Sequence, residues 1–184
     1  MSAKAPSAMS SSHAVTAADF RSACGLFASG VTVVTRRLPD DAPYGMTVSS
    51  FTSVSLDPPL ILVCIDRNAR FLRDLLPEQA FGVNILSEQQ QHIAARFADR
   101  KEDDRFAGVA WSAGWEGVPL LGGVVVTFAC SLQQTIPSGD HFILIGEVHQ
   151  IRRHKGSPLV WCDRGYHFLP AVGRAEEEVE ERRS

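Results

Sequence analysis

Residues 124–151 read VVVTFACSLQQTIPSGDHFILIGEVHQI and contain the clearest strand pattern of the chain. From Val124 to Gln134, bulky apolar side chains alternate with smaller or more polar ones, which is the pattern of a β-strand. Ser138, Gly139 and Asp140 form a tight-turn sequence, and residues 142–151 follow as a second long strand. The stretch therefore predicts two long antiparallel strands joined by a short turn.

Further strands and a few helices are predicted on both sides of this hairpin. Runs of apolar and β-branched residues indicate strands at 31–35, 45–53, 60–65, 81–86, 159–162 and 166–169. Helices are expected from the capping residue Thr16 to about Gly30, over 69–75, and over 88–98 after the capping residue Ser87. Because strands and helices do not alternate regularly, we expect a mainly β fold with peripheral helices, a β-barrel and not a doubly wound sheet.

Composition restricts the class of protein. The chain has 184 residues, 45% of them hydrophobic, with a net charge of −3, so it suits one globular domain and carries no overall basic charge for nucleic acid. No apolar run approaches the roughly 20 residues that span a bilayer, and the polar N-terminal segment is not typical of a secretory signal. We expect no nucleic-acid partner and no membrane partner.

The ends of the chain differ in composition from the middle. Residues 1–16 are rich in Ser and Ala and are expected to be a disordered tail, and residues 173–184 are expected to be a charged tail after a folded domain at 17–172.

The four cysteines lie far apart in apolar stretches, so we expect them to be reduced residues of the core and the protein to be cytoplasmic. These cysteines are Cys24, Cys64, Cys130 and Cys162.

Common catalytic motifs are absent, but hydroxyl groups cluster in one segment. The sequence contains no GxSxG, P-loop, HExxH or GxGxxG pattern, which disfavours common hydrolases, nucleotide triphosphatases and Rossmann dehydrogenases. Residues 47–55 contain six hydroxyl side chains, which could bind phosphate oxygens at the edge of a strand. A polar solvent face of an edge strand is the alternative interpretation.

Three motifs carry a family resemblance. GMTVSSFTSVSLDPPLILVCIDRNA at 45–69, FGVNIL at 81–86 and GDHFILIGEV at 139–148 occur in the order and spacing of the short-chain flavin reductases. The chain resembles this family, the reductase components of two-component flavin-dependent monooxygenases, over roughly residues 20–169. The resemblance implies an FMN-binding split barrel.

The resemblance also implies which residues bind the flavin. The T-x-S-S segment at 47–50, together with Met46, is expected to lie along the ribityl phosphate and the ring edge of the flavin. The loop at 66–69, which follows the apolar strand, is expected to lie beside the ring and the phosphate. A helix beginning at Ala69 would favour the anion, whereas a surface ion pair is the alternative for Arg67. Phe97 and Arg105 could contact phosphate or adenine. The cofactor-binding residues implied up to this point are Met46, Thr47, Val48, Ser49, Ser50, Asp66, Arg67, Asn68, Ala69, Phe97 and Arg105.

Two further residues are placed at the mouth of the barrel. His141, in the G-D-H motif, is implied to contact the nicotinamide and is the predicted catalytic residue; without the resemblance it reads as a surface histidine at a strand end. Tyr166 could line the same mouth, or its ring could pack in the core.

The resemblance predicts an NAD(P)H:flavin oxidoreductase. In such an enzyme a hydride passes from the nicotinamide to flavin N5, and the reduced FMN or FAD leaves for an oxygenase component. The sequence leaves FMN or FAD, and NADH or NADPH, undecided. A split-barrel protein that holds flavin or haem without turnover, and a relative of pyridoxamine-phosphate oxidase, are the alternatives.

A homodimer is expected, since small split barrels resemble one another in forming pairs. No bound metal is expected.

Overall fold

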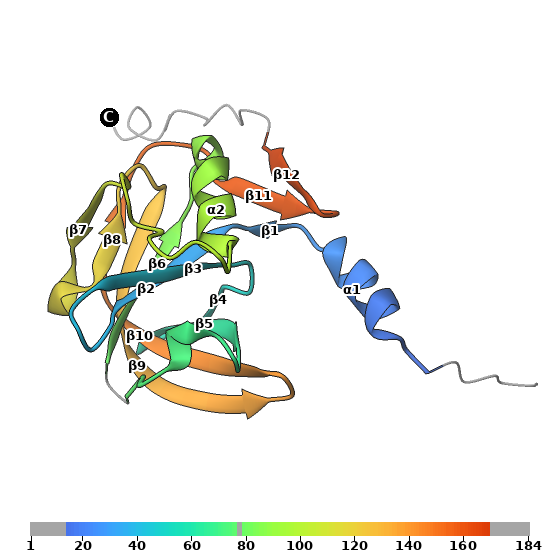
Figure 1. Cartoon of the computed structure of the whole chain (residues 1–184), viewed down its shortest axis with the longest axis horizontal. Coiled ribbons are helices and arrows are strands. Elements are labelled where there is room, and N and C mark those ends of the chain that lie inside the picture. The colour runs from blue at the N-terminus through green and yellow to red at the C-terminus, as the bar shows by residue number, and fades with distance from the viewer. Residues whose placement is uncertain (1–13, 77–78, 170–184) are drawn as a thin grey trace, which may run out of the picture.

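The computed structural model describes residues 14–76 and 79–169, and most of these lie in strands (Figure 1). The expected tails at 1–16 and 173–184 lie outside the described residues except for residues 14–16. The helices are α1 (Ala17–Gly25) and α2 (Gln91–Ala98), and the short 3-10 helices are η1 (Arg70–Leu72), η2 (Glu88–Gln90) and η3 (Trp115–Gly117). The strands are β1 (Ser29–Gly30), β2 (Thr32–Arg37), β3 (Pro43–Val48), β4 (Thr52–Leu56), β5 (Pro59–Asp66), β6 (Ala80–Ile85), β7 (Trp111–Ala113), β8 (Pro119–Leu121), β9 (Val126–Ser138), β10 (His141–Arg153), β11 (Leu159–Cys162) and β12 (Gly165–Phe168).

One antiparallel sheet of seven strands forms the body of the protein. Its order is β3-β2-β6-β9-β10-β5-β4, so the two long strands β9 and β10 lie at its centre, as the quoted stretch predicts. Gly139 takes the left-handed conformation, with φ at 61°, in the turn between them. The two edge strands, β3 and β4, are consecutive in the chain, so the sheet curls toward itself as a split barrel with a gap between its edges (Figure 1). The mainly β prediction is confirmed.

The barrel interior is filled by alternate residues of the central strands. On β5, Ile61, Val63 and Ile65 are buried while their neighbours are half-buried. They pack with Phe81, Leu144 and other side chains of β2, β6, β9 and β10 in one apolar cluster. A second cluster lies between α2 and the small sheet β1-β11-β12, and a third lies under the β7-β8 hairpin.

The helices differ in how they join the body. A capping box formed by Ser87 and Gln90 begins the helical segment that continues as α2, which buries Ile93, Ala94 and Phe97, so the helix predicted at 88–98 is confirmed. α1 begins at the N-cap Thr16, as predicted, but ends at Gly25 and buries no residue. Gly30 lies in β1 and is not the cap of this helix.

The structure corrects three local predictions and adds one hairpin that was not predicted. The strand predicted at 45–53 is two strands, β3 and β4, because residues 49–51 belong to neither and the two strands pair with different neighbours. The helix predicted at 69–75 is only the three-residue η1, and the β7-β8 hairpin was not predicted, since its strands have three residues each. Cys24 is exposed and not in the core, because α1 stands away from the barrel; Cys64 and Cys162 are half-buried, only Cys130 is buried, and all four are free.

Membrane insertion by a helix finds no support in the described part of the chain. None of the helices at 14–76 and 79–169 has both the length and the apolar character needed to cross a bilayer.

Candidate functional site

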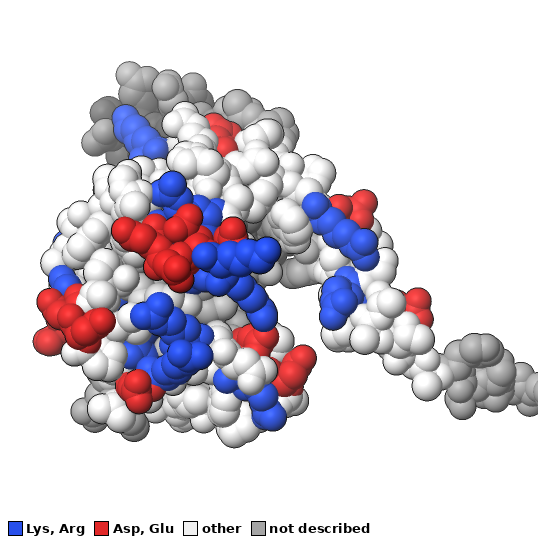
Figure 2. Space-filling model, viewed as in Figure 1, with Lys and Arg blue, Asp and Glu red and all other residues white. Residues whose placement is uncertain are grey.

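A groove of about 460 Å³ lies where β3, the end of β5 and α2 meet the segment at 100–105. Its walls carry both signs of charge, and Figure 2 shows basic and acidic side chains gathered side by side on one face of the molecule. The lining residues are Tyr44, Met46, Thr47, Asp66, Asn68, Ala69, Arg70, Arg73, Phe97, Ala98, Arg100, Glu102, Asp103 and Arg105. Seven of the predicted site residues are therefore brought together by the fold: Met46, Thr47, Asp66, Asn68, Ala69, Phe97 and Arg105.

Thr47 links the edge strand β3 to α2. Its hydroxyl donates a hydrogen bond of 2.8 Å to the Ala94 carbonyl oxygen. Because a hydroxyl has one proton and two lone pairs, Thr47 can still accept a hydrogen bond from a ligand but has no proton left to donate. Met46, one residue earlier, packs its side chain against the barrel core.

Val48, Ser49 and Ser50 do not line the groove. Val48 is buried in the barrel core, and Ser49 is exposed in the segment that leaves the sheet. The Ser50 hydroxyl donates to the Cys64 carbonyl oxygen at 3.0 Å and accepts from the Cys64 N–H at 2.8 Å. The Ser50 hydroxyl thus takes the place of a neighbouring strand's backbone beside Cys64 on β5. The sequence alone carried no sign of this use of the hydroxyl.

A hydrogen-bonded turn follows β5 and forms one end of the groove. The Asp66 carboxylate accepts from the Asn68 N–H at 2.9 Å and from Arg100 at 3.2 Å. The bond from Asn68 and then the bond and charge of Arg100 lower the pKa of Asp66, so this carboxylate is ionised at neutral pH. Arg67 is exposed, and its N–H donates to the Asp140 carbonyl oxygen at 3.0 Å. Because the helix after Ala69 has three residues, its dipole adds little to anion binding.

Arg105 fastens the segment at 99–105 to β3. Its guanidinium donates to the Asp99 carbonyl oxygen at 2.7 and 3.1 Å, and to the Tyr44 hydroxyl and the Gly45 carbonyl oxygen at 2.9 Å each. These bonds use four of its five N–H groups, which leaves one for a ligand together with the positive charge. Phe97 is 1% exposed and packs edge-on against Phe106 at 5.1 Å, so it supports the groove from beneath.

An arginine cluster around Tyr44 was not predicted. The guanidinium carbons of Arg70 and Arg105 both lie 5.3 Å from the centre of the Tyr44 ring, and Arg73 lines the same groove. Three ion pairs form within the described residues, and none includes Arg70, Arg73 or Arg105. These charges are available to an anion. The spacing of Arg70 and Arg73 after the turn was a usable signal, but the position of Tyr44 required the strand register.

His141 lies beside the groove at the start of β10. The register places it opposite Asp66 on β5, which lines the groove. Its Nδ1 is 2.8 Å from an Asp140 carboxylate oxygen, and this contact lowers the pKa of Asp140. Asp140 therefore accepts from Nδ1–H and leaves Nε2 of the half-exposed ring free for another partner.

Tyr166 lies in a different part of the molecule. It is on β12 in the three-stranded sheet, and its ring packs against Trp161 at 4.9 Å beside the second apolar cluster. Burial raises the pKa of its hydroxyl. Of the two interpretations open at the sequence level, this position matches the packing of the ring.

The groove has the chemistry of a binding site for an aromatic anion. It combines a tyrosine face, unneutralised arginines, acceptor oxygens and an apolar floor.

Among residues 14–76 and 79–169, no group of three or more His, Cys, Asp or Glu side chains is arranged to hold a metal ion.

Comparisons with known proteins agree on one family. A family model described as "Flavin reductase like domain" matches residues 24–170. The chain is 38% identical to an NADH-dependent flavin reductase of Rhodococcus sp, over 88% of this chain and 92% of that protein. It is 40% identical to the reductase component of a flavin-dependent trigonelline monooxygenase of Acinetobacter baylyi, over 83% of this chain and 49% of that protein.

A solved structure supports the same relationship. The Streptomyces globisporus NADH:FAD oxidoreductase SgcE6, in complex with NAD and FAD fragments, superposes with a TM-score of 0.78 at 35% identity, covering 85% of this chain and 94% of that one. The chain spans about half the length of the trigonelline relative and of another curated relative that it matches.

Substitution of Arg105 by Lys tests how the groove wall is held. Lysine keeps the charge but cannot make the four hydrogen bonds, so the segment at 99–105 should open more often. We expect trypsin to cleave after Arg100 or Lys101 about tenfold faster in native conditions, since the loss of such a network costs on the order of 1–2 kcal/mol. Arg164→Lys, in an exposed turn, is the control, and equal cleavage rates in all three proteins would contradict this role.

Proposed function

Because the chain belongs to the flavin reductase-like family, we propose that it is an NAD(P)H-dependent flavin reductase that supplies reduced flavin to a partner monooxygenase. The observation that carries this proposal is the groove, which joins an aromatic wall and free arginines next to the G-D-H histidine. The matched relatives named as flavin reductases support the same activity. They give no support to the alternatives, a split-barrel carrier without turnover or a pyridoxamine-phosphate oxidase.

The residues of the groove fit a flavin mononucleotide or dinucleotide. Arg70, Arg73 and the remaining N–H of Arg105 would bind phosphate oxygens, since guanidinium groups form strong charge-assisted hydrogen bonds to phosphate. Thr47 would accept a hydrogen bond from a polar group of the ligand. The N–H groups of Arg67, Asn68 and Ala69 already donate within the protein, so the Asn68 side chain, which lines the groove, would serve as the donor along the ring edge.

His141 would position the nicotinamide. When bound, the flavin supplies the hydride acceptor, and the chain has only to orient the two molecules and exclude water between them. The free Nε2 of His141, held in place through Asp140, is suited to a hydrogen bond with the carboxamide of the nicotinamide. No side-chain acid or base is needed for this transfer.

The flavin is FMN or FAD, and the reductant is NADH or NADPH. The similar structure that holds NAD and FAD fragments supports FAD over FMN and NADH over NADPH. The partner is an oxygenase component, as the name of the trigonelline relative suggests. Four free cysteines accord with a cytoplasmic location. We place the reductase domain at residues 17–172, a range that contains the family match.

The proposed enzyme is a homodimer in which α1 packs on the second copy. α1 has nine residues and no buried side chain, and Figure 1 shows it standing away from the barrel. A helix this short is only marginally stable in water without packing. Phe20, Leu26 and Phe27 are 64%, 66% and 80% exposed, and a second copy of the chain would cover them.

Steady-state oxidation of NADH and NADPH with added FMN or FAD tests the activity. We expect flavin-dependent oxidation, and His141→Ala should raise the KM for the nicotinamide about tenfold, the cost of one lost hydrogen bond, with flavin affinity unchanged within about twofold. His154→Ala, on an exposed histidine outside the groove, should leave both values unchanged. No oxidation with any pair would reject the activity, and equal loss of both affinities would reject the assigned role of His141.

Light scattering coupled to size exclusion tests the dimer. We expect a mass of about 40 kDa, twice that of the chain. The double variant Phe20→Ser/Phe27→Ser should dissociate at concentrations about a hundredfold higher than the parent, since apolar anchors dominate interface energies. Leu56→Ser, which alters another exposed apolar residue, is the control. A parent mass near 20.1 kDa would contradict the dimer.

A further inference from the structure

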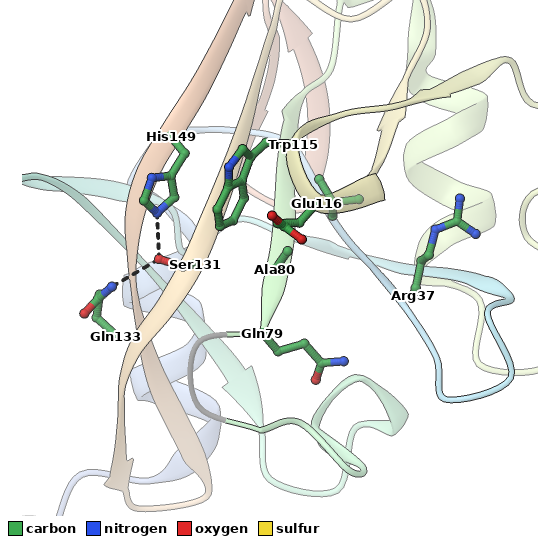
Figure 3. A pocket seen from close by; sticks show the side chains of 9 residues that line it. Arg37, Gln79, Ala80, Trp115, Glu116, Ser131, Gln133 and His149 are labelled. Carbon is green, nitrogen blue, oxygen red and sulfur yellow. Dashed lines mark hydrogen bonds between the residues drawn. The ribbon is translucent and has the colours of Figure 1, made fainter.

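A second cavity, of about 530 Å³, lies outside the barrel wall and shares no lining residue with the flavin groove. It is bounded by β9, β10 and η3, with Trp115, Glu116, Ser131, Gln133 and His149 around it (Figure 3). The proposed reductase activity uses none of these residues. The volume is within the range of small-molecule sites.

The floor of this cavity is a fixed chain of polar groups. Ser131 is 6% exposed, and its hydroxyl lies 2.8 Å from His149 Nε2 and accepts from the Gln133 amide at 3.1 Å. The imidazole in turn stacks on Trp115 at 4.1 Å with an angle of 21° between the planes. His149 therefore covers one face of the indole. Figure 3 shows the Glu116 carboxylate on the opposite side of the Trp115 ring from His149.

The backbone at Glu116 is strained in a way that favours a functional role. Glu116 has φ 52° and ψ 29°, the left-handed region that glycine adopts without cost. The turn is held from outside, because Arg37 Nε donates to the Gly117 carbonyl oxygen at 2.8 Å and the backbone N–H of Trp115 donates to the Gln150 side-chain oxygen at 2.9 Å. Strain of this kind in a non-glycine residue is concentrated at binding sites and active sites.

The cavity lining carries one carboxylate, that of Glu116, and one guanidinium, that of Arg37. Glu116 belongs to none of the three ion pairs found in the described part of the chain. Asp41, outside the lining, lies 3.1 Å from the Arg37 guanidinium, so Glu116, Arg37 and Asp41 together carry a net charge of −1. The remaining polar groups are the neutral Ser131, Gln133 and Gln79 and the imidazole of His149.

A free carboxylate beside an indole face is a combination that recognises organic cations. The ring quadrupole attracts an alkylated ammonium, and the carboxylate adds a charge of opposite sign, while apolar neighbours such as Val118 and Ala80 suit its carbon groups. We propose that this cavity binds a small organic cation carrying a quaternary or alkylated ammonium group. An anion would be repelled by Glu116, and a purely apolar ligand would leave its carboxylate without a counter-charge.

Isothermal titration calorimetry on the full chain tests this proposal with choline and with neohexyl alcohol, its uncharged carbon analogue. Choline should bind at least about fivefold more tightly than the alcohol, within the range that cation–π and ion-pair contacts supply. Glu116→Gln and Trp115→Leu should each weaken choline about three- to tenfold. Glu88→Gln removes the same charge outside the cavity and should change nothing. Equal binding of choline and the alcohol, or full choline affinity in Glu116→Gln, would overturn the proposal.

A second variant separates lost binding from lost folding. Glu116→Gly relieves the left-handed strain, so it should raise the Tm by about 2 °C while abolishing the preference for choline. A Glu116→Gly protein that keeps this preference would overturn the proposal. Nα-acetyl-lysinamide is the last probe: tighter binding of this compound than of choline would assign the cavity to a lysine of a protein partner and would overturn the small-molecule ligand. Flavin titrations of the same variants should be unchanged, so failure here is distinguishable from failure of the reductase activity.

Discussion

The antiparallel pairing of β9 with β10 organises the main sheet and both of the cavities described above. Each strand has 13 residues, and the two lie at the centre of the seven-stranded sheet, so every other strand of that sheet is placed relative to them. Because β10 also pairs with β5, its register sets His141 opposite Asp66 at the edge of the flavin groove. The same two strands carry Ser131 and His149 on the outer wall, so one ladder supports both cavities.

Much of the fold was predictable because its signals are local. Alternation of side chains, the turn at Gly139 and the caps at Thr16 and Ser87 identified the strands and helices close to their observed bounds. Errors arose where tertiary structure overrides a local pattern. The hydroxyl-rich run at 45–53 looks like one strand, yet the sheet must leave its plane there to close the barrel, and Ser50 compensates by bonding to Cys64.

The candidate site was predictable in part, for the same reason. The family resemblance located the segments that line the groove, including Thr47, Asp66 and Arg105. It could not tell which side chains already use their hydrogen bonds within the protein, and Ser50 is the clearest case. Nor could it find Tyr44, whose position between Arg70 and Arg105 depends on contacts between three separate segments.

Fluorescence titration of flavin binding measures whether the arginines at Tyr44 hold the phosphate of a flavin. Riboflavin has the same ring system as FMN but lacks the phosphate, so the ratio of their affinities isolates this contact. We expect FMN and FAD to bind at least about tenfold more tightly than riboflavin, and Arg70→Ala/Arg73→Ala to remove most of the difference. Equal affinity of the three flavins for the parent protein, or an unchanged ratio in the double variant, would contradict it.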